Sequence, residues 1–159
     1  MNKSKVAILK TAPETVLQDI PKVMRMADFE NALPKNKTTI LKDNISWHFP
    51  YISANTTPWQ LEGTVLALIV AGYTDITAVH NNTVVTDPYK GQVMNKLAPI
   101  YKKYHIEEKY NFIPEDIQWI EYKPKAKMRV LDRVYPEGIR IPEYFIDKNI
   151  VHLPTVKTH

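Results

Sequence analysis

Short apolar runs alternate along this chain with longer segments whose apolar residues recur every three or four positions. A short apolar run is typical of a buried β-strand, whereas the longer period is typical of an amphipathic helix. We therefore predict strands at residues 6–9, 38–41, 75–79, 117–122 and 150–153. Helices are predicted at residues 14–32, 57–72 and 88–104.

The helix predicted at residues 57–72 has the clearest boundary signals. Thr57 is a favoured N-cap residue, Pro58 follows at the first helical position, and Gln60 stands where a capping box needs it. Gly72 follows the last apolar position, as is usual at a helix C-terminus. These signals predict where this helix begins and ends.

Proline interrupts the other two helical segments. Pro21 predicts a break or kink near the first turns of the helix at residues 14–32, because proline has no amide hydrogen to donate. For the same reason, Pro99 argues against a continuous helix over the second half of residues 88–104.

The alternation of strands and helices predicts a single α/β domain over residues 1–159. This order is typical of a parallel sheet with crossover helices, so we expect a three-layer sandwich around a mostly parallel, Rossmann-like sheet. A peripheral hairpin is expected from residues 128–131 and 140–145. The four glycines are not spaced for a dinucleotide-binding turn or a P-loop, so the chain has neither motif.

The composition limits the classes of protein to consider. The chain contains no cysteine, which excludes disulfides, a cysteine nucleophile and thiolate-bound clusters within it. Its longest apolar run, residues 65–71, is too short to span a membrane, and the N-terminal run is too short for a secretory signal. We therefore expect a cytoplasmic protein with no membrane partner. The net charge of +4 comes from scattered lysines, which favour a solvated surface.

Polar side chains follow three of the predicted strands, at the point where each strand ends. The carboxyl ends of parallel strands share one edge of a sheet, and ligands bind there in open α/β folds. We therefore expect a single site formed by three clusters, which are Lys42, Asp43 and Asn44; His80, Asn81 and Asn82; and Lys157, Thr158 and His159.

Four residues in this region are predicted to bind a small anionic molecule. Lys42, Asn44 and Asn81 carry hydrogen-bond donors that suit a carboxylate or a phosphate. His48 lies in the long loop at residues 44–55, and long loops in compact domains often carry function. The alternative is that Lys42 is a solvated charge and that the asparagines follow strands because they suit turns.

Three residues, Lys157, His159 and His80, are predicted to be catalytic. The histidines are candidates for moving a proton or for binding a metal, while Lys157 fixes negative charge. The histidine spacings match no metal motif, so no metal site is predicted within the chain. His80 has a second interpretation as a hydrogen-bonded structural residue. His105 is expected to be structural or exposed, and His152 is expected to be packed within the last strand.

The end of the sequence carries the most specific motif, Leu-Pro-x-x-Lys-Thr-His at residues 153–159. Together with Leu-Lys-Asp-Asn at residues 41–44 and the Thr-Pro helix start at residues 57–58, it resembles the family known as domain of unknown function 362. Asp43 departs from that family's pattern, which usually has proline there. The His-Asn-Asn at residues 80–82 replaces a segment that is Asp- or Gly-rich in many members.

The resemblance implies that the chain is the N-terminal part of a larger family domain. Family members continue past the closing motif, and many carry a ferredoxin-like module with two 4Fe-4S clusters. The resemblance therefore implies a link to iron–sulfur redox chemistry and anaerobic metabolism. It implies no cofactor within this chain, and clusters in a ferredoxin-like partner or a C-terminal module. It also marks Lys42, Asn44, Lys157 and His159 as site residues.

Three functions are compatible with these features. The first is an enzyme, or a fragment of one, that acts on a small anionic substrate at the strand ends. The second is a non-catalytic subunit or truncated relic that docks on a partner chain or on a second copy of itself. The third is nucleic-acid binding, which rests only on the mild basic charge and on aromatic residues near lysines. No recognition motif supports it, so we expect no nucleic-acid partner.

Overall fold

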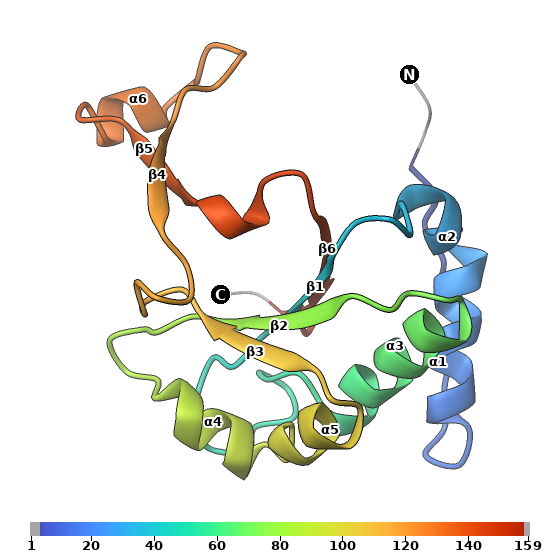
Figure 1. The fold of residues 1–159 in the computed structure, drawn as a ribbon. Helices are drawn as coiled ribbons and strands as arrows, with labels where there is room; N and C mark the ends of the chain where they lie inside the picture. The colour runs from blue at the N-terminus through green and yellow to red at the C-terminus, as the bar shows by residue number, and fades with distance from the viewer. Residues whose placement is uncertain (1–3, 158–159) are drawn as a thin grey trace.

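The computed structural model describes residues 4–157 and contains a four-stranded parallel sheet (Figure 1). The sheet has the order β3-β2-β1-β6, and each neighbouring pair is parallel. Its strands are β1 (Thr39–Asp43), β2 (Ile76–His80), β3 (Glu107–Tyr110) and β6 (Asn149–Leu153). This arrangement confirms the predicted α/β class with a Rossmann-like sheet.

Helices connect the strands and cover one face of the sheet. The main helices are α1 (Val16–Met26), α2 (Phe29–Ala32), α3 (Pro58–Val70), α4 (Pro88–Met94) and α5 (Ala98–Lys103). Helix α3 joins β1 to β2, and α4 and α5 join β2 to β3. Figure 1 shows α3, α4 and α5 on the same side of the sheet. The connection from β3 to β6 instead forms an arm that extends away from the sheet.

The sheet separates two apolar clusters, because neighbouring residues of a strand point to opposite faces. On the helix side, Leu41 and Ala78 belong to the larger cluster, which includes Leu61, Leu68 and Tyr101 among its buried members. On the other side, Ile40 and Val79 pack with Ile117, Tyr144 and Phe145. The third layer is therefore a short irregular segment, which includes a 3₁₀ turn, η1 (Glu143–Phe145).

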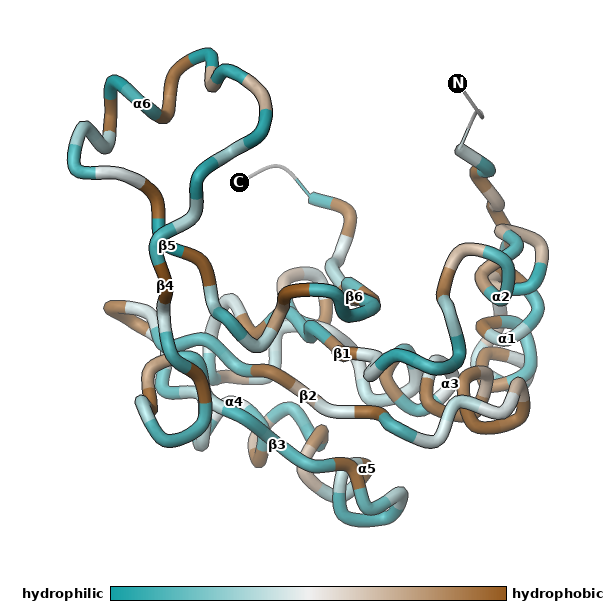
Figure 2. The backbone as a smooth tube through the Cα atoms, turned by 45° about the horizontal axis from the view of Figure 1, so that its top comes forward, coloured by the Kyte–Doolittle hydropathy of each residue, from teal (hydrophilic) through white to brown (hydrophobic). Residues whose placement is uncertain are grey.

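The arm is a two-stranded antiparallel ribbon with a loop at its tip (Figures 1 and 2). Its elements are β4 (Trp119–Tyr122), α6 (Leu131–Val134) and β5 (Ile139–Pro142). The run at residues 117–122 was predicted to be the fourth strand of the main sheet, and that prediction is wrong. The predicted hairpin strand at residues 128–131 is also wrong, since these residues lead into α6.

The fourth strand of the main sheet is β3, whose sequence contains no apolar run. Its sequence is Glu-Glu-Lys-Tyr, and its first residue is exposed. Because β3 is an edge strand and partly faces solvent, its polar side chains are tolerated. A search for apolar runs therefore passes over it.

The run at residues 6–9 was predicted to be a strand, and the structure contradicts this. The segment has no strand assignment, and the side chains of Val6 and Ile8 are 85% and 84% exposed. A strand needs a neighbouring chain to bond to its backbone groups. Among residues 4–157, no strand pairs with this segment.

Two predicted helices are each divided by a residue with a left-handed backbone. Asp28 has φ 65° and separates α1 from α2, and Lys96 has φ 61° and separates α4 from α5. Pro21 lies inside α1 without ending it, so it does not break the helix, and the alternative of a kink stays a prediction. Pro99 lies in the first turn of α5, where its missing amide hydrogen has no helical partner to lose.

The boundaries predicted for α3 are confirmed. Thr57 Oγ1 accepts a hydrogen bond of 3.3 Å from the Gln60 amide at the start of the helix. At its end, Gly72 has φ 89° and the Tyr73 amide donates to the Leu68 carbonyl at 3.0 Å. This is the Schellman arrangement, in which a left-handed glycine closes the last turn. It places Tyr73 in the core beneath the sheet.

Candidate functional site

A pocket of about 390 Å³ opens at the carboxyl ends of β1 and β2. Its walls come from the last residues of both strands and from the loops that follow them. The lining residues that matter for its chemistry are Lys42, Asp43, Asn44, Ser46, His80 and Asn81. The structure thus brings together four of the predicted site residues, two from each strand end.

The long loop after β1 is held in shape by the buried side chain of Asn55. Its Oδ1 accepts hydrogen bonds from the Ser46 and Trp47 amides at 2.9 and 3.2 Å. Its Nδ2 lies within hydrogen-bond distance of the carbonyls of Trp47 and Phe49 and of Asn95 Oδ1, at 2.8 to 2.9 Å. One asparagine therefore fixes the loop that carries Ser46 to the pocket and ties it to the end of α4.

Thr56 joins the ends of β1 and β6 beneath the pocket. Its Oγ1 accepts a hydrogen bond of 2.7 Å from the Asn44 amide and donates one of 2.5 Å to the Leu153 carbonyl. The side chain of Gln60 donates to the Pro154 carbonyl at 3.4 Å. The first turn of α3 therefore positions the segment after β6, which carries Lys157, beside the end of β1.

Gly91 allows α4 to approach the same loop closely. A Cβ atom at this position would lie 2.6 Å from Cγ2 of Ile45, well inside contact distance. Asn95, one turn later, donates to the Gly91 carbonyl at 2.9 Å and to the His48 carbonyl at 3.3 Å. A side chain at position 91 would therefore push the loop away from the helix that supports it.

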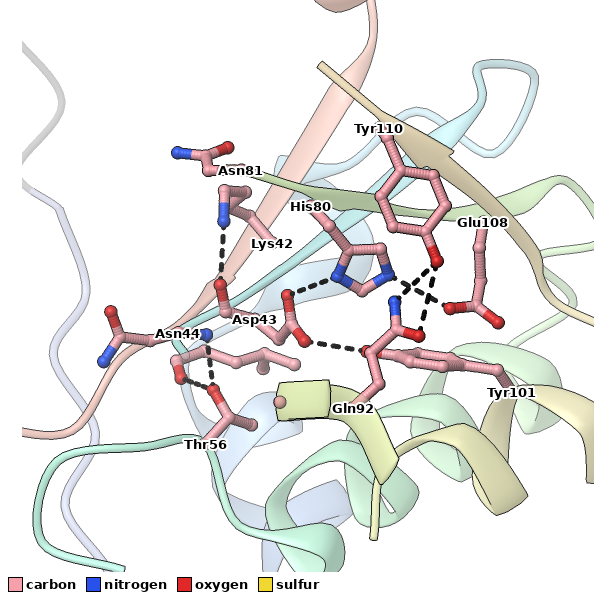
Figure 3. A network of polar contacts seen from close by, with 12 residues as sticks. Lys42, Asp43, Asn44, Thr56, His80, Asn81, Gln92, Tyr101, Glu108 and Tyr110 are labelled. Carbon is pink, nitrogen blue, oxygen red and sulfur yellow. Dashed lines mark hydrogen bonds and ion pairs between the residues drawn. The ribbon is translucent and has the colours of Figure 1, made fainter. Parts of the chain in front are cut away.

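Three ionisable side chains form a chain of contacts behind the pocket (Figure 3). Nδ1 of His80 lies 3.2 Å from Oδ1 of Asp43, and Nε2 lies 3.3 Å from Oε2 of Glu108. The His80 and Asp43 side chains are almost fully buried, and Glu108 is partly exposed. The imidazole ring is therefore held between two carboxylates.

These contacts set the charge of the group. Burial lowers the pKa of His80, but the two carboxylates outweigh it and raise the pKa to about 9. Burial raises the pKa of Asp43, and the contacts with His80 more than offset this, so the pKa lies below its usual value. At neutral pH the group is an imidazolium between two carboxylates, with a net charge of −1.

Tyrosines surround this group from the helix side and from β3. Tyr101 Oη donates to Asp43 Oδ2 at 3.0 Å, and burial together with this carboxylate raises the pKa of Tyr101. Tyr110 exchanges hydrogen bonds with Gln92, and its ring centre lies 5.3 Å from that of His80. These neighbours help to bury His80 and Asp43 and hold their geometry, while Glu108 stays partly exposed.

Lys42 precedes Asp43 in β1, so its side chain leaves the strand on the face opposite to that of Asp43. It nevertheless lines the same pocket. Its Nζ donates to the Asp43 carbonyl at 2.8 Å, as Figure 3 shows. Burial lowers the pKa of Lys42, and the nearby charge of Asp43 only partly opposes this. Within the part of the chain that the structure describes, no carboxylate lies within ion-pair distance of this ammonium group.

The predicted residue Lys157 lies beside the same pocket, next to Ser46, but is not among the residues that line it. Its Nζ donates to Ser46 Oγ at 2.7 Å, across more than a hundred residues of sequence. Asn44 Nδ2 is directed away from the pocket centre, because it donates to Ser46 Oγ at 3.1 Å and to the Ala54 carbonyl at 2.7 Å. Asn81 is exposed, and its Oδ1 accepts a hydrogen bond from Asn111. The binding roles of the two asparagines remain predictions.

The histidines occupy different places. His48 lines a neighbouring pocket rather than this one. His105 is exposed, as expected, whereas His152 is also exposed and not packed as predicted, because β6 is an edge strand. The predicted catalytic residue His159 lies outside the described residues, as does Thr158.

Sequence reasoning missed the partners of His80. Tyr101 belongs to the helix predicted at residues 88–104, and Glu108 lies beyond it, outside any predicted strand or helix. Asp43 was placed in the site but was assigned no role, although a buried carboxylate beside a histidine at adjacent parallel strand ends is a recognisable signal. The position of Glu108 depended on knowing that β3 exists.

Comparisons with protein-family models, with curated proteins and with solved structures found no match for this chain. Across residues 4–157, no helix is long and apolar enough to cross a membrane. In the same residues, no group of three or more His, Asp and Glu side chains is arranged to hold a metal ion. Any assignment of function therefore depends on the geometry of the strand-end pocket.

Proposed function

We propose that the pocket binds a small anion, a carboxylate or a phosphate, and that the chain is an enzyme or enzyme fragment acting on that molecule. The observation that carries this proposal is Lys42. A partly buried ammonium without a carboxylate partner is costly, and an anionic ligand would remove that cost. The ammonium also lines a pocket large enough for such a ligand.

The groups around Lys42 support the same ligand. Lys157 and the Ser46 hydroxyl form a second donor pair beside the pocket. The group of Asp43, His80 and Glu108 has a net charge of −1, so the two lysines leave the site with one positive charge in excess. Because both carboxylates already contact the imidazolium, little of their charge opposes an incoming anion.

The proposed chemistry is proton transfer at the bound anion. Lys42 is the proposed proton donor because its ammonium group lies where the anion would bind; burial lowers its pKa in the free protein, and the bound anion would raise it again. Both ring nitrogens of His80 face carboxylates, so a catalytic role for His80 requires one of these contacts to open. In the closed arrangement His80 holds Asp43 and the end of β1 in position.

The proposals for the cellular compartment and the protein partner rest on the family resemblance. We propose that the chain works in the cytoplasm with a ferredoxin-like partner or module carrying 4Fe-4S clusters. The chain itself has no cysteine to ligate such clusters, so its own contribution would be the binding of the anionic substrate.

Isothermal titration with inorganic phosphate and with acetate tests the binding. Wild type is compared with Lys42→Met, which keeps the length of the side chain but removes the charge. Lys102→Met, at an exposed lysine of α5, is the matched control. We expect at least one of the two anions to bind wild type and the control, and its affinity to fall about tenfold or more in Lys42→Met. No binding of either anion, or equal binding to all three proteins, would refute the proposal.

A second candidate function is assembly with another chain, which the exposed edge of β6 favours. Among residues 4–157, strand β6 pairs only with β1, and the side chains of Val6 and Ile8 are exposed. Exposed edges and apolar segments are common sites of strand pairing between chains. Light scattering behind a sizing column tests self-assembly. A dimer that Ile8→Lys dissociates is the expected result, and a monomer at all concentrations would exclude it.

A further inference from the structure

A second pocket adjoins the strand-end pocket and differs from it in character. It has a volume of about 520 Å³ and shares Thr83, Val85 and Pro88 with the first pocket. Its remaining walls include His48, Tyr89 and Phe112. The three shared residues make the two pockets direct neighbours.

The walls of this second pocket carry aromatic rings that are only partly covered. Tyr89 is 48% exposed and Phe112 is 37% exposed. Their ring centres lie 6.2 Å apart with the planes at 85°, and Tyr89 also packs 4.7 Å from Tyr110. The rings therefore support one another while their outer surfaces face the pocket. Such surfaces favour the flat, apolar part of a ligand.

The carboxylate of Asp87 makes the second pocket unfavourable for the anionic end of a ligand. Asp87 lines the second pocket, and its Oδ1 accepts a hydrogen bond of 3.1 Å from the Lys90 amide at the start of α4. This position fixes its negative charge beside the aromatic walls, and Lys90 Nζ, 3.9 Å from Oδ2, only partly offsets it. A negatively charged group is therefore favoured near Lys42 in the first pocket and disfavoured in the second.

The loop that lines both pockets is tied to the loop after β1. Thr86 Oγ1 donates to the Ser46 carbonyl at 3.0 Å, and the Thr86 amide donates to Thr83 Oγ1 at 3.1 Å. These bonds connect the shared residue Thr83 to the loop that Asn55 holds. The two pockets are thus fixed relative to one another, which suits recognition of one extended ligand.

We propose that the ligand is an aryl or heteroaryl anion, with its carboxylate or phosphate at Lys42 and its ring against the exposed surfaces of Tyr89 and Phe112. This inference rests on the proposed function, because it adds a ring subsite to the anion site. It narrows the substrate class from any small anion to one that carries a flat ring. The ring lies against the aromatic walls of the second pocket, whose volume of about 520 Å³ is large enough to admit it.

Titration with phenyl phosphate and methyl phosphate at about pH 7.5 separates the two sites, because both probes are mainly dianions there. We expect phenyl phosphate to bind wild type about tenfold more tightly than methyl phosphate. Tyr89→Ala and Phe112→Leu should remove most of this advantage and leave methyl phosphate binding unchanged. Tyr135→Ala removes a tyrosine of similar exposure, 49%, from the arm and should keep the advantage.

The outcomes distinguish the two proposals. If both phosphates bind through Lys42 with equal affinity, the ring subsite is wrong and the anion site stands. If phenyl phosphate is preferred but the preference survives both Tyr89→Ala and Phe112→Leu, the ring lies elsewhere and the inference is again wrong. If phenyl phosphate binds equally well to Lys42→Met, the ligand does not span the two pockets. If neither probe binds, both proposals fail.

Discussion

Nδ1 of His80 lies 3.2 Å from Oδ1 of Asp43, and neither side chain has more than 2% of its surface exposed. The two residues end neighbouring parallel strands, so their contact joins β1 to β2 at the edge where the pocket opens. Glu108, from the next strand, contacts the other ring nitrogen. Three adjacent strands are therefore linked by one charged group.

This link makes the stability of the fold depend on pH. The pKa of His80 is about 9 in the folded protein, above its ordinary value of 6.5. Its stabilising charge is thus fully present below about pH 6.5 and is lost as the pH rises through 9. We expect the free energy of unfolding to fall by on the order of 2–3 kcal/mol over this interval. Urea denaturation at a series of pH values measures it.

Two variants identify the group responsible. His80→Asn should remove the dependence above pH 6.5 and also destabilise the fold, by about 3–5 kcal/mol, because two carboxylates lose the cation between them. His105→Asn, at an exposed histidine, should keep the wild-type dependence. A pH dependence that persists unchanged in His80→Asn would contradict the assignment.

The loop that forms the pocket wall should depend on Asn55. In Asn55→Asp an oxygen replaces the amide nitrogen and faces the carbonyls of Trp47 and Phe49. We expect the free energy of unfolding to fall by about 2–3 kcal/mol, and phosphate affinity to fall with it because Ser46 is displaced. Denaturation and titration of the same sample measure both quantities. Asn36→Asp, at an exposed turn, should change neither, and a neutral Asn55→Asp would show that the loop is held in another way.

The close packing of α3 against α1 should make the substitution of Gly63 by alanine destabilising, although alanine usually stabilises a helix interior relative to glycine. Alanine in place of glycine normally stabilises a helix interior by about 0.5–1 kcal/mol. At Gly63, however, a Cβ atom would lie 2.8 Å from Cβ of Ile20 on α1. We expect Gly63→Ala to destabilise the protein by about 1–3 kcal/mol, because the helices must separate. A higher urea midpoint for Gly63→Ala would show that α1 can shift without cost.

Lys157 should contribute less to anion binding than Lys42. It is exposed beside the pocket, where water and salt screen its charge. We expect Lys157→Met to weaken phosphate binding about two- to fivefold, and the difference from wild type to shrink as sodium chloride is added. Titration at low and high salt measures this. A larger loss of phosphate affinity in Lys157→Met than in Lys42→Met would show that the anion binds mainly to the segment after β6.

The sequence predicted the features that depend on local pattern. The caps of α3, the apolar cores of β1 and β2, and the polar residues at their ends are all local, and the structure contains them. A parallel sheet follows from the alternation of these elements, so the location of the pocket could also be predicted. The sequence therefore placed Lys42 and His80 at the pocket, and their roles there stay predictions.

The features that sequence reasoning missed depend on contacts between distant segments. Strand β3 has a charged sequence that is stable only because it lies beside β2, and without it Glu108 had no place in the site. The run at residues 6–9 has the pattern of a strand but lacks a partner among the described residues. The effect of Gly91 depends on the approach of Ile45, which no local pattern encodes.

The most direct test of the anion site is the ionisation of Lys42 itself. NMR of protein whose lysines are isotopically labelled at Cε measures the pKa of the Lys42 ammonium. The spectrum of Lys42→Met identifies which signal belongs to Lys42. We expect a pKa below the ordinary 10.5 in the free protein, because burial lowers it. Saturating phosphate or acetate should raise that pKa, because the anion supplies the missing counter-charge. A pKa that does not move when the anion binds would contradict the claim that Lys42 is its partner.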